Sequence, residues 1–328
     1  MSVLVVGPIG LDELHWPWGS RTNLLGGAVP AFTLAACHFD TVRVVSVVGD
    51  DFPADLRATF DREGVDTTGL RVAPGPTFRW GARYHDDLNT RDVLYTELGV
   101  FGEFTPDIPE TLRASDVAFA TATNPTLQER SLRQVRATAQ VTALDTMDPW
   151  IDEARPELER VLGLTDVAMM AEDEAQRLGD SPSIAVAARQ VGRLGPTYVT
   201  VKQGSHGAVL FGPDQRTYAV PAWPLDRVVD PTGAGDAFAG GFLGYLGHQL
   251  ASHQRASGRL LAWEALCQAT IWGTVLGAFA CEGPGVERLS TLTQAELDER
   301  YAALLTLAPP IDETTGASHG SYSRDVSS

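Results

Sequence analysis

The sequence contains few cysteines and few basic residues, and no apolar run in it is long enough to cross a membrane. Its three cysteines (Cys37, Cys267 and Cys281) show no paired or metal-ligand spacing, which favours buried thiols of a cytoplasmic protein. The chain has 25 Lys and Arg residues against 42 Asp and Glu residues, a formal net charge of −17. Because such a surface repels nucleic acid and anionic lipid, we expect neither as a partner.

Several catalytic and targeting motifs are also absent. The chain has no G-x-x-x-x-G-K-[S/T] loop of P-loop nucleotide-binding proteins and no G-x-S-x-G elbow of hydrolases. Its 7 histidines show no clustered ligand spacing, so we assign none to a metal. The N-terminal MSVLVVG lacks the basic region of a signal peptide and predicts a strand followed by a glycine turn, again favouring a cytoplasmic protein.

Short apolar runs alternate with helical patterns along most of the chain. Strands are predicted at Val3–Gly7, Val42–Val48, Val117–Thr121, Val141–Leu144, Val167–Met170 and Tyr198–Val201. Helices are predicted at 28–38, 53–63, 126–139, 153–162, 172–178 and 183–193. This alternation predicts an α/β fold with a mostly parallel central sheet covered by helices on both faces. Ligands in such folds bind at the carboxyl ends of the strands.

Two segments interrupt this alternation. Residues 10–25 and 71–104 read as strands and turns, with strand-like runs at Thr77–Tyr84 and Val93–Leu98. We interpret them as insertions that form a small β lid over the site, although ordinary surface hairpins are the alternative. Residues 1–308 are predicted to form the folded domain, and the Pro-, Thr-, Ser- and Gly-rich residues 309–328 a disordered tail.

The most informative motif runs from Asp230 to Phe242, DPTGAGDAFAGGF. Glycines at 233 and 235 permit a tight turn and leave backbone N–H groups uncovered, and the apolar helix that follows adds its positive N-terminal end. Such a site binds a phosphate-like anion. Asp236 among these amides suits a base that takes a proton from a hydroxyl while the amides hold a phosphoryl group. The alternative is a glycine-rich turn with Asp236 as an ordinary helix cap.

This string resembles the C-terminal signature of the PfkB family of carbohydrate and nucleoside kinases, and the resemblance extends over roughly residues 1–305. It implies a ribokinase-like α/β/α sandwich with a β lid. It also implies that the ATP γ-phosphoryl group is transferred to a hydroxyl of a sugar or sugar-like substrate. Asp236 would be the base, and the amides of Gly233, Ala234 and Gly235 would form the anion hole.

The resemblance also implies an acceptor site. Asp12, after the first strand, matches an acid that accepts hydrogen bonds from substrate hydroxyls, and Gly26 and Gly27 match the N-terminal glycine signature that contacts the sugar. Most family members carry asparagine at the position of Ala31, so the usual hydroxyl recognition is altered here. In the predicted lid, Arg79 could face the site, whereas a half-buried hairpin is the alternative.

The nucleotide is expected beside Lys202, Gly204 and Gly207, whose spacing resembles the family's ATP-binding turn; a hairpin turn with an exposed lysine is the alternative. Glu174 matches the acid that positions Mg²⁺ through water, although Ala171 replaces the usual asparagine. The resemblance also places a monovalent cation such as K⁺ near Asp230 and Thr232.

Two other functions remain open. One is a nucleoside kinase on the same fold, which the lid aromatics and the missing asparagine would suit. The other is a non-catalytic ligand-binding or regulatory protein, which would be expected to lack the base or the anion-hole glycines; both are present here. A homodimer through the lid strands is compatible with the resemblance.

Overall fold

A computed structural model describes residues 2–252 and 261–308; for residues 251 and 252 it gives the backbone alone. The expected tail at 309–328 lies outside the described residues.

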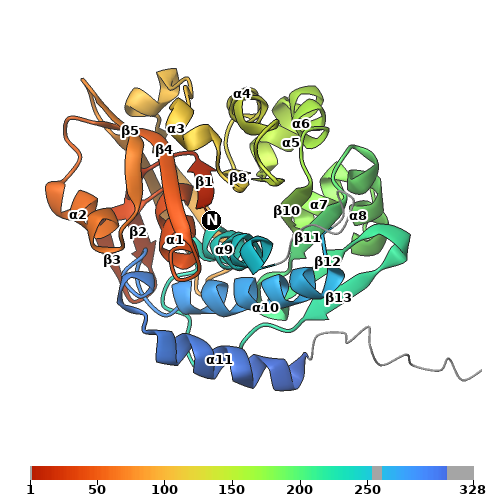
Figure 1. The fold of residues 1–328 in the computed structure, drawn as a ribbon. Coiled ribbons are helices and arrows are strands. Elements are labelled where there is room, and N and C mark those ends of the chain that lie inside the picture. The colour runs from red at the N-terminus through yellow and green to blue at the C-terminus, as the bar shows by residue number, and fades with distance from the viewer. Residues whose placement is uncertain (1, 253–260, 309–328) are drawn as a thin grey trace, which may run out of the picture.

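A nine-stranded sheet has the order β13-β12-β11-β10-β9-β8-β1-β4-β5 (Figure 1). Its strands are β1 (Ser2–Val6), β4 (Thr41–Gly49), β5 (Asp66–Ala73), β8 (Val117–Ala120), β9 (Val141–Asp145), β10 (Val167–Ala171), β11 (Tyr198–Lys202), β12 (Ala208–Phe211) and β13 (Thr217–Val220). Neighbouring strands are parallel except that β12 is antiparallel to β11 and β13.

Helices cover both faces of this sheet (Figure 1). One layer contains α1 (Ala28–Ala36), α2 (Ala54–Arg62), α9 (Ala234–Ser252), α10 (Trp263–Ala280) and α11 (Gln294–Leu307). The other contains α3 (Glu110–Arg113), α4 (Pro125–Val135), α5 (Asp148–Glu153), α6 (Arg155–Leu162), α7 (Glu172–Leu178) and α8 (Ile184–Arg193). The six predicted strands and six predicted helices are therefore confirmed, as is the three-layer α/β/α class.

Alternate residues of the strands supply two separate cores. Val3 and Val5 of β1 pack toward the layer that contains α9, whereas Leu4 and Val6 pack toward the layer that contains α4. This alternation follows from the pleat of a strand, since successive side chains point to opposite faces. Both sets are apolar because both faces are covered, which is why the strands read as continuous apolar runs in the sequence.

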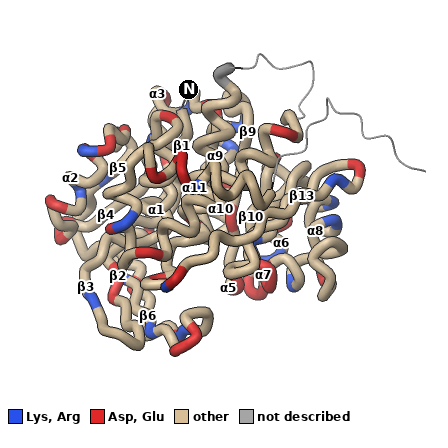
Figure 2. Tube along the Cα trace, turned by 90° about the horizontal axis from the view of Figure 1, so that it is seen from below, with Lys and Arg blue, Asp and Glu red and all other residues tan. Residues whose placement is uncertain are grey.

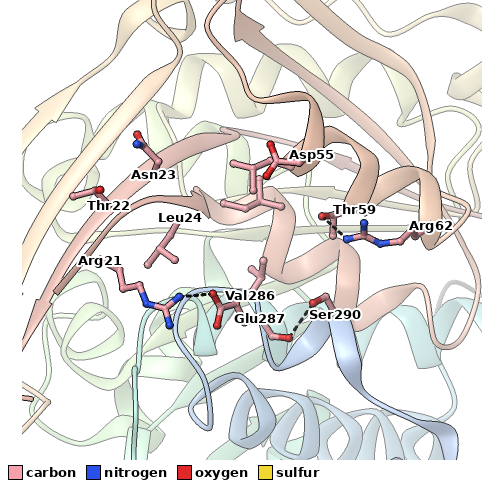
Figure 3. A pocket seen from close by; sticks show the side chains of 12 residues that line it. Arg21, Thr22, Asn23, Leu24, Asp55, Thr59, Arg62, Val286, Glu287 and Ser290 are labelled. Atoms are coloured by element: carbon pink, nitrogen blue, oxygen red, sulfur yellow. Dashed lines mark hydrogen bonds and ion pairs between the residues drawn. The ribbon is translucent and has the colours of Figure 1, made fainter. Parts of the chain in front are cut away.

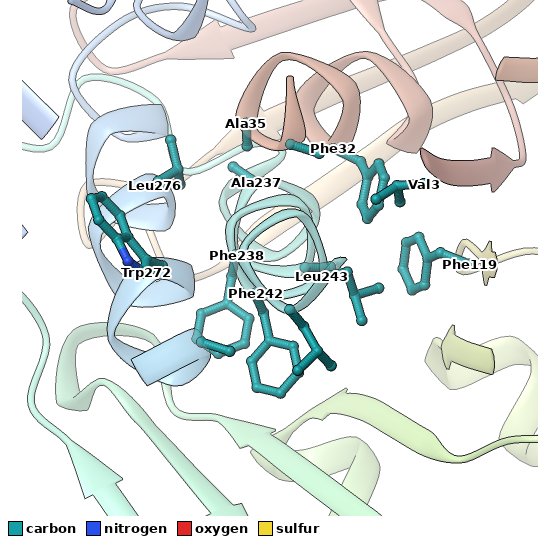
Figure 4. Close-up of a cluster of buried hydrophobic side chains, with 14 of the residues drawn as sticks. Val3, Phe32, Ala35, Phe119, Ala237, Phe238, Phe242, Leu243, Trp272 and Leu276 are labelled. Atoms are coloured by element: carbon teal, nitrogen blue, oxygen red, sulfur yellow. The ribbon is translucent and has the colours of Figure 1, made fainter. Parts of the chain in front are cut away.

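Helix α9 is held at the centre of its layer between α1 and α10 (Figure 4). A Cβ atom on Gly240 would lie 2.3 Å from the Phe32 backbone oxygen, and one on Gly241 would lie 2.7 Å from the Trp272 backbone oxygen. Glycine therefore allows the three helix backbones to approach closely. This close packing fixes the N-terminal end of α9, where Asp236 lies.

The lid is a separate four-stranded sheet of order β3-β2-β6-β7. Its strands are β2 (Gly10–Trp16), β3 (Gly19–Gly26), β6 (Phe78–Tyr84) and β7 (Arg91–Glu97). The small β sheet expected from the sequence is thus confirmed. β7 begins two residues earlier than expected, because Arg91 pairs with Tyr84 across the turn. The Asp87 carboxylate closes this turn by accepting hydrogen bonds from the N–H groups of Asn89 and Thr90. Residues 71–73 were expected in the lid segment 71–104 but lie in β5, which pairs with β4 in the large sheet.

Along the chain trace in Figure 2, Lys and Arg residues are interspersed among Asp and Glu residues. Among the described residues, no helix is both long and apolar enough to cross a membrane.

Candidate active site

Asp236 lies in the first turn of α9, immediately after the loop that carries Gly233. Gly233 has a φ of 76°, a left-handed conformation that favours glycine, and it turns the chain into the helix. Ala234 N–H lies 3.3 Å from the Pro231 oxygen, a long contact. Within residues 2–252 and 261–308, no acceptor is found for the N–H groups of Gly233, Gly235 and Asp236. The helix therefore presents free donors at its N-terminal end, as an anion site requires.

The pKa of the Asp236 side chain is shifted toward neutral pH. Burial raises the pKa of Asp236 to about 7, the carboxylate of Asp145 adds to the rise, and the ammonium of Lys202 opposes it. No hydrogen bond between its carboxylate and another described residue is found. A carboxyl group with this pKa exchanges a proton readily near neutral pH.

Lys202, at the end of β11, forms an ion pair with Asp145, at the end of β9. Burial alone would lower the pKa of Lys202, but the carboxylates of Asp145 and Glu174 outweigh it, so the pKa is raised and the lysine stays charged. A Cβ atom on Gly235 would lie 3.2 Å from the Lys202 Nζ atom. The lysine charge thus lies directly beside the predicted anion hole.

Glu174 lies on the same side of the site. Its Oε2 atom accepts a hydrogen bond from the Ala171 N–H at 2.6 Å. Burial raises the pKa of Glu174 to about 8, with Asp145 adding to the rise and Lys202 opposing it. In the part of the chain that the structure describes, no group of three or more His, Cys, Asp or Glu side chains is arranged to hold a metal. Any Mg²⁺ here would take most of its ligands from water and phosphate oxygens, as this ion commonly does.

Asp12, Gly26 and Gly27 come together at the base of the lid. A Cβ atom on Gly26 would lie 2.1 Å from Asp12 Cγ, so only glycine fits beside this carboxyl group. Burial raises the pKa of Asp12 to about 8, Asp230 adds to the rise, and a hydrogen bond from the Gly27 backbone opposes it. The buried Asp12 Oδ1 atom has no hydrogen-bond partner among the described residues. An unpaired buried carboxyl oxygen is suited to a substrate hydroxyl.

Asp230 is fully buried at the start of the motif loop. Its two carboxylate oxygens accept hydrogen bonds from the N–H groups of Thr232, at 2.9 Å, and Gly285, at 2.7 Å. The Thr232 Oγ1 atom lies 2.8 Å from the Tyr84 hydroxyl of the lid. The lid therefore contacts the motif loop directly.

The chain matches the model of the pfkB family of carbohydrate kinases over residues 19–253. It belongs to this family. It is 29% identical to the cytidine kinase of Thermococcus kodakarensis over 74% of this chain and 87% of that protein. It is 35% identical to a fructokinase of Klebsiella pneumoniae over 82% of this chain and 92% of that protein. A fructokinase double mutant of Vibrio cholerae, solved with fructose, ADP and potassium ion, aligns with a TM-score of 0.71 at 21% identity, over 92% of this chain and 98% of that one.

Membership of this family makes the chain a phosphotransferase that acts on an alcohol group. Its fold is ribokinase-like, as the sequence predicted. Sugar kinases and nucleoside kinases both occur among the relatives, so the comparisons leave the type of acceptor open.

Of the residues predicted to bind the acceptor, Arg79 does not lie on the same face of the lid as Asp12. In the pairing of β2 with β6, Arg79 aligns with Leu11, whereas Asp12 aligns with Trp80. Successive side chains alternate, so Trp80, and not Arg79, shares the face of Asp12. Arg79 instead donates to Asp51 and Asn23, at 3.0 Å each. The sequence indicated the strand but not its register, which decides which side chains share the face of Asp12.

A cavity of about 440 Å³ lies along the β3 edge of the lid, between α2 and the segment after α10 (Figure 3). It is lined in part by Arg21, Asp55, Arg62 and Glu287, and Arg21 donates to Glu287 at 2.8 Å. None of the predicted site residues lines it. The candidate active site is therefore defined by the side chains around the N-terminal end of α9, not by this cavity.

Proposed function

We propose that this kinase transfers the γ-phosphoryl group of ATP to a hydroxyl of a sugar or sugar-like acceptor, with Asp236 as the base. The observation that carries the proposal is the Asp236 carboxyl, whose pKa is raised to about 7 and which no described residue hydrogen-bonds. It lies beside the N–H groups of Gly233 and Gly235, which have no acceptor among the same residues. This pairs a proton acceptor with an anion site in one helix turn. A structural helix cap would instead direct its carboxylate to those N–H groups.

In the proposed reaction, the acceptor oxygen forms a bond to the γ-phosphorus as the bond from that phosphorus to the β,γ-bridging oxygen breaks. The hydroxyl proton passes to Asp236, and ADP leaves with the bridging oxygen. The amides of Gly233, Ala234 and Gly235 would hold the oxygens of the transferring group, where negative charge is concentrated. A fixed set of donors of this kind requires little rearrangement during transfer.

The nucleotide would approach from the side of β11. Gly204 and Gly207, with φ values of 54° and 97°, form the turn after this strand, and a Cβ atom on Gly207 would lie 2.0 Å from the Val220 backbone oxygen. Lys202 would place its charge near the phosphates. Glu174 would orient Mg²⁺ through water, and Mg²⁺ would neutralise phosphate charge. Because no group of three or more described His, Cys, Asp or Glu side chains is arranged to hold a metal, such an ion would be held mainly by phosphate and water.

A monovalent cation is the second ion in the proposal, near Asp230 and Thr232. Asp230 is fully buried, and among the described residues no Lys or Arg forms an ion pair with it. Burial raises its pKa, which reflects the cost of a buried negative charge. A K⁺ ion close to this carboxylate would offset that cost.

On the acceptor side, Asp12 would bind substrate hydroxyls and the Gly26–Gly27 backbone would lie against the substrate. The fructokinase relative supports a sugar acceptor. A nucleoside is the second candidate, and the relative named cytidine kinase supports it.

The test is ADP formation from ATP and Mg²⁺ with a panel of sugars, sugar derivatives and nucleosides. We expect ADP formation that depends on one class of acceptor, with one phosphorylated product per ADP. ATP binding measured by calorimetry without turnover on any acceptor would contradict the proposal and favour a non-catalytic ligand-binding protein.

A further inference from the structure

The face of the lid that meets the motif loop is set by the register of its strands. Asp12 of β2 is aligned with Trp80 of β6, and the same face continues through Ala82 to Tyr84. Tyr84 is paired directly with Arg91 of β7, so Arg91 shares this face. We call the surface formed by Asp12, Trp80, Tyr84 and Arg91 the inner lid face.

Contacts between the lid and the core place this face over the proposed acceptor site. The Tyr84 hydroxyl lies 2.8 Å from Thr232 Oγ1, within the motif loop that leads to Asp236. The charges of Asp230, Arg91 and Asp12 all act on the Tyr84 phenol. Arg91 therefore lies near the Tyr84 hydroxyl, as the carboxyl groups of Asp12 and Asp230 do.

Arg91 differs from Lys202 and Arg79 in how the described residues hold its charge. Lys202 is bound by Asp145, and Arg79 is bound by Asp51. The Arg91 guanidinium instead lies 6.0 Å from the centre of the Trp80 ring. No carboxylate of the described residues forms an ion pair or hydrogen bond with it; its neighbour Asp92 binds His85. A cation–π contact of this kind holds a guanidinium over an aromatic ring while leaving its N–H groups free to bind.

The surroundings of Arg91 suggest which ligand those N–H groups would take. The site already contains the carboxyl groups of Asp12, Asp230 and Asp236, so an anionic ligand would be repelled unless a cation met it. A guanidinium matches a carboxylate or a phosphate group with two parallel hydrogen bonds. A neutral sugar or nucleoside could accept hydrogen bonds from Arg91 but would carry no charge to balance it.

We propose that the acceptor carries an anionic group, a carboxylate or a phosphate, which Arg91 binds from the inner lid face while Asp12 binds the hydroxyls. This inference rests on the proposed function and narrows its substrate class to sugar acids and sugar phosphates. The anionic group lies at the end of the substrate remote from the hydroxyl that is phosphorylated, because Arg91 is on the lid and Asp236 is on the core.

The experiment compares anionic acceptors with their neutral parents, for example gluconate and glucose 6-phosphate with glucose, and fructose 1-phosphate and fructose 6-phosphate with fructose. Steady-state ADP formation is measured for the wild type and for Arg91→Ala, Arg91→Lys and Arg83→Ala. Arg83 is the matched control, because it is an exposed arginine on the opposite face of the lid. Binding of each acceptor to Asp236→Asn, alone and combined with Arg91→Ala, is measured by calorimetry in parallel.

We expect an anionic compound to be the preferred acceptor. Arg91→Ala should raise its KM about 10- to 100-fold, the effect of losing hydrogen bonds to a charged group, with a smaller change in kcat. Arg91→Lys should recover part of the loss, and Arg83→Ala should behave as the wild type. Carboxylate and phosphate substrates are separated by which member of the panel turns over.

Preference for a neutral sugar or nucleoside would overturn this inference and leave the proposed function intact. An unchanged KM for an anionic acceptor in Arg91→Ala would overturn it as well. If no acceptor turns over, the proposed function fails, and the calorimetry alone tests the inference. The inference survives if anionic compounds bind Asp236→Asn and bind the double variant with Arg91→Ala more weakly. Any other binding result overturns it.

Discussion

Lys202 forms a buried ion pair with Asp145 across two strands that are not neighbours, since β10 lies between β9 and β11. The pair lies at the carboxyl ends of these strands, beside the N-terminal end of α9. The charge of Asp145 adds to the rise in the pKa of Asp236, and the charge of Lys202 opposes this rise. The ion pair therefore links the proposed phosphate site to the proposed base.

Replacing Lys202 by methionine is expected to raise the pKa of Asp236 above about 7, because a stabilising positive charge is lost. In a profile of kcat/KM against pH, the acid limb should move to higher pH, and the KM for ATP should rise. Lys202→Arg, which retains the charge, is the control. An acid limb that stays in place in a folded Lys202→Met protein would show that the lysine does not act on the base.

Lys202→Met should also destabilise the fold, since Asp145 would be left buried without its partner. The expected loss in the free energy of unfolding is roughly 3–5 kcal/mol. The double variant Asp145→Asn/Lys202→Met removes both charges and should recover much of this loss. Urea unfolding of the three proteins measures it, and equal stability of the single and double variants would contradict a buried ion pair.

For the wild type, the sign of the pH dependence follows from the role of Asp236. The base accepts a proton only in its ionised form, and its pKa is raised to about 7. Activity should therefore be present above pH 7 and fall by about tenfold per pH unit well below it. The pH profile of kcat/KM tests this. A rate that remains constant down to pH 5 would be incompatible with a base of this pKa.

Gly240 tests whether close helix packing positions α9. An added methyl would lie 2.3 Å from the Phe32 backbone oxygen, so Gly240→Ala should cost about 1–3 kcal/mol in the free energy of unfolding and also reduce kcat. Gly192→Ala in α8 is the control, because its methyl would meet no atom within 4 Å. That substitution should stabilise the protein by up to about 1 kcal/mol through helix propensity. Thermal or urea unfolding of both variants gives the comparison, and similar stability would contradict the packing argument.

The buried Asp230 carboxylate predicts a dependence on monovalent cations. Replacing K⁺ by a bulky organic cation at constant ionic strength should lower kcat/KM, and restoring K⁺ should recover it. Asp230→Asn, which removes the buried charge, should abolish this response. Activity that is indifferent to K⁺ in the wild type would argue against an ion near Asp230 and Thr232.

Much of the fold could be predicted from the sequence because its signals are local. The buried strands appear as apolar runs, such as Val42–Val48 and Tyr198–Val201, and the helices as periodic stretches between them. The motif that ends at Asp236 likewise carries its turn glycines and its helix within a few residues. Each of these features depends on neighbours in the chain.

The remaining features depend on pairings between distant segments. Which residues of the lid share the face of Asp12 depends on its alignment with Trp80, separated by nearly seventy residues, so the sequence suggested Arg79, which lies on the opposite face. The partner of Lys202 is likewise distant, since Asp145 reaches it only after the strands assemble. Strand order and register arise from the whole sheet and cannot be read from either segment alone.

The central claim is that Asp236 is the base, and the most direct measurement is the kcat of Asp236→Asn with ATP and the best acceptor of the panel. Asp61→Asn, a change to an exposed carboxylate on α2, is the matched control. We expect kcat to fall by about 10²- to 10⁴-fold in Asp236→Asn, with ATP affinity retained and the control unchanged. A kcat within a few-fold of the wild type would contradict the account.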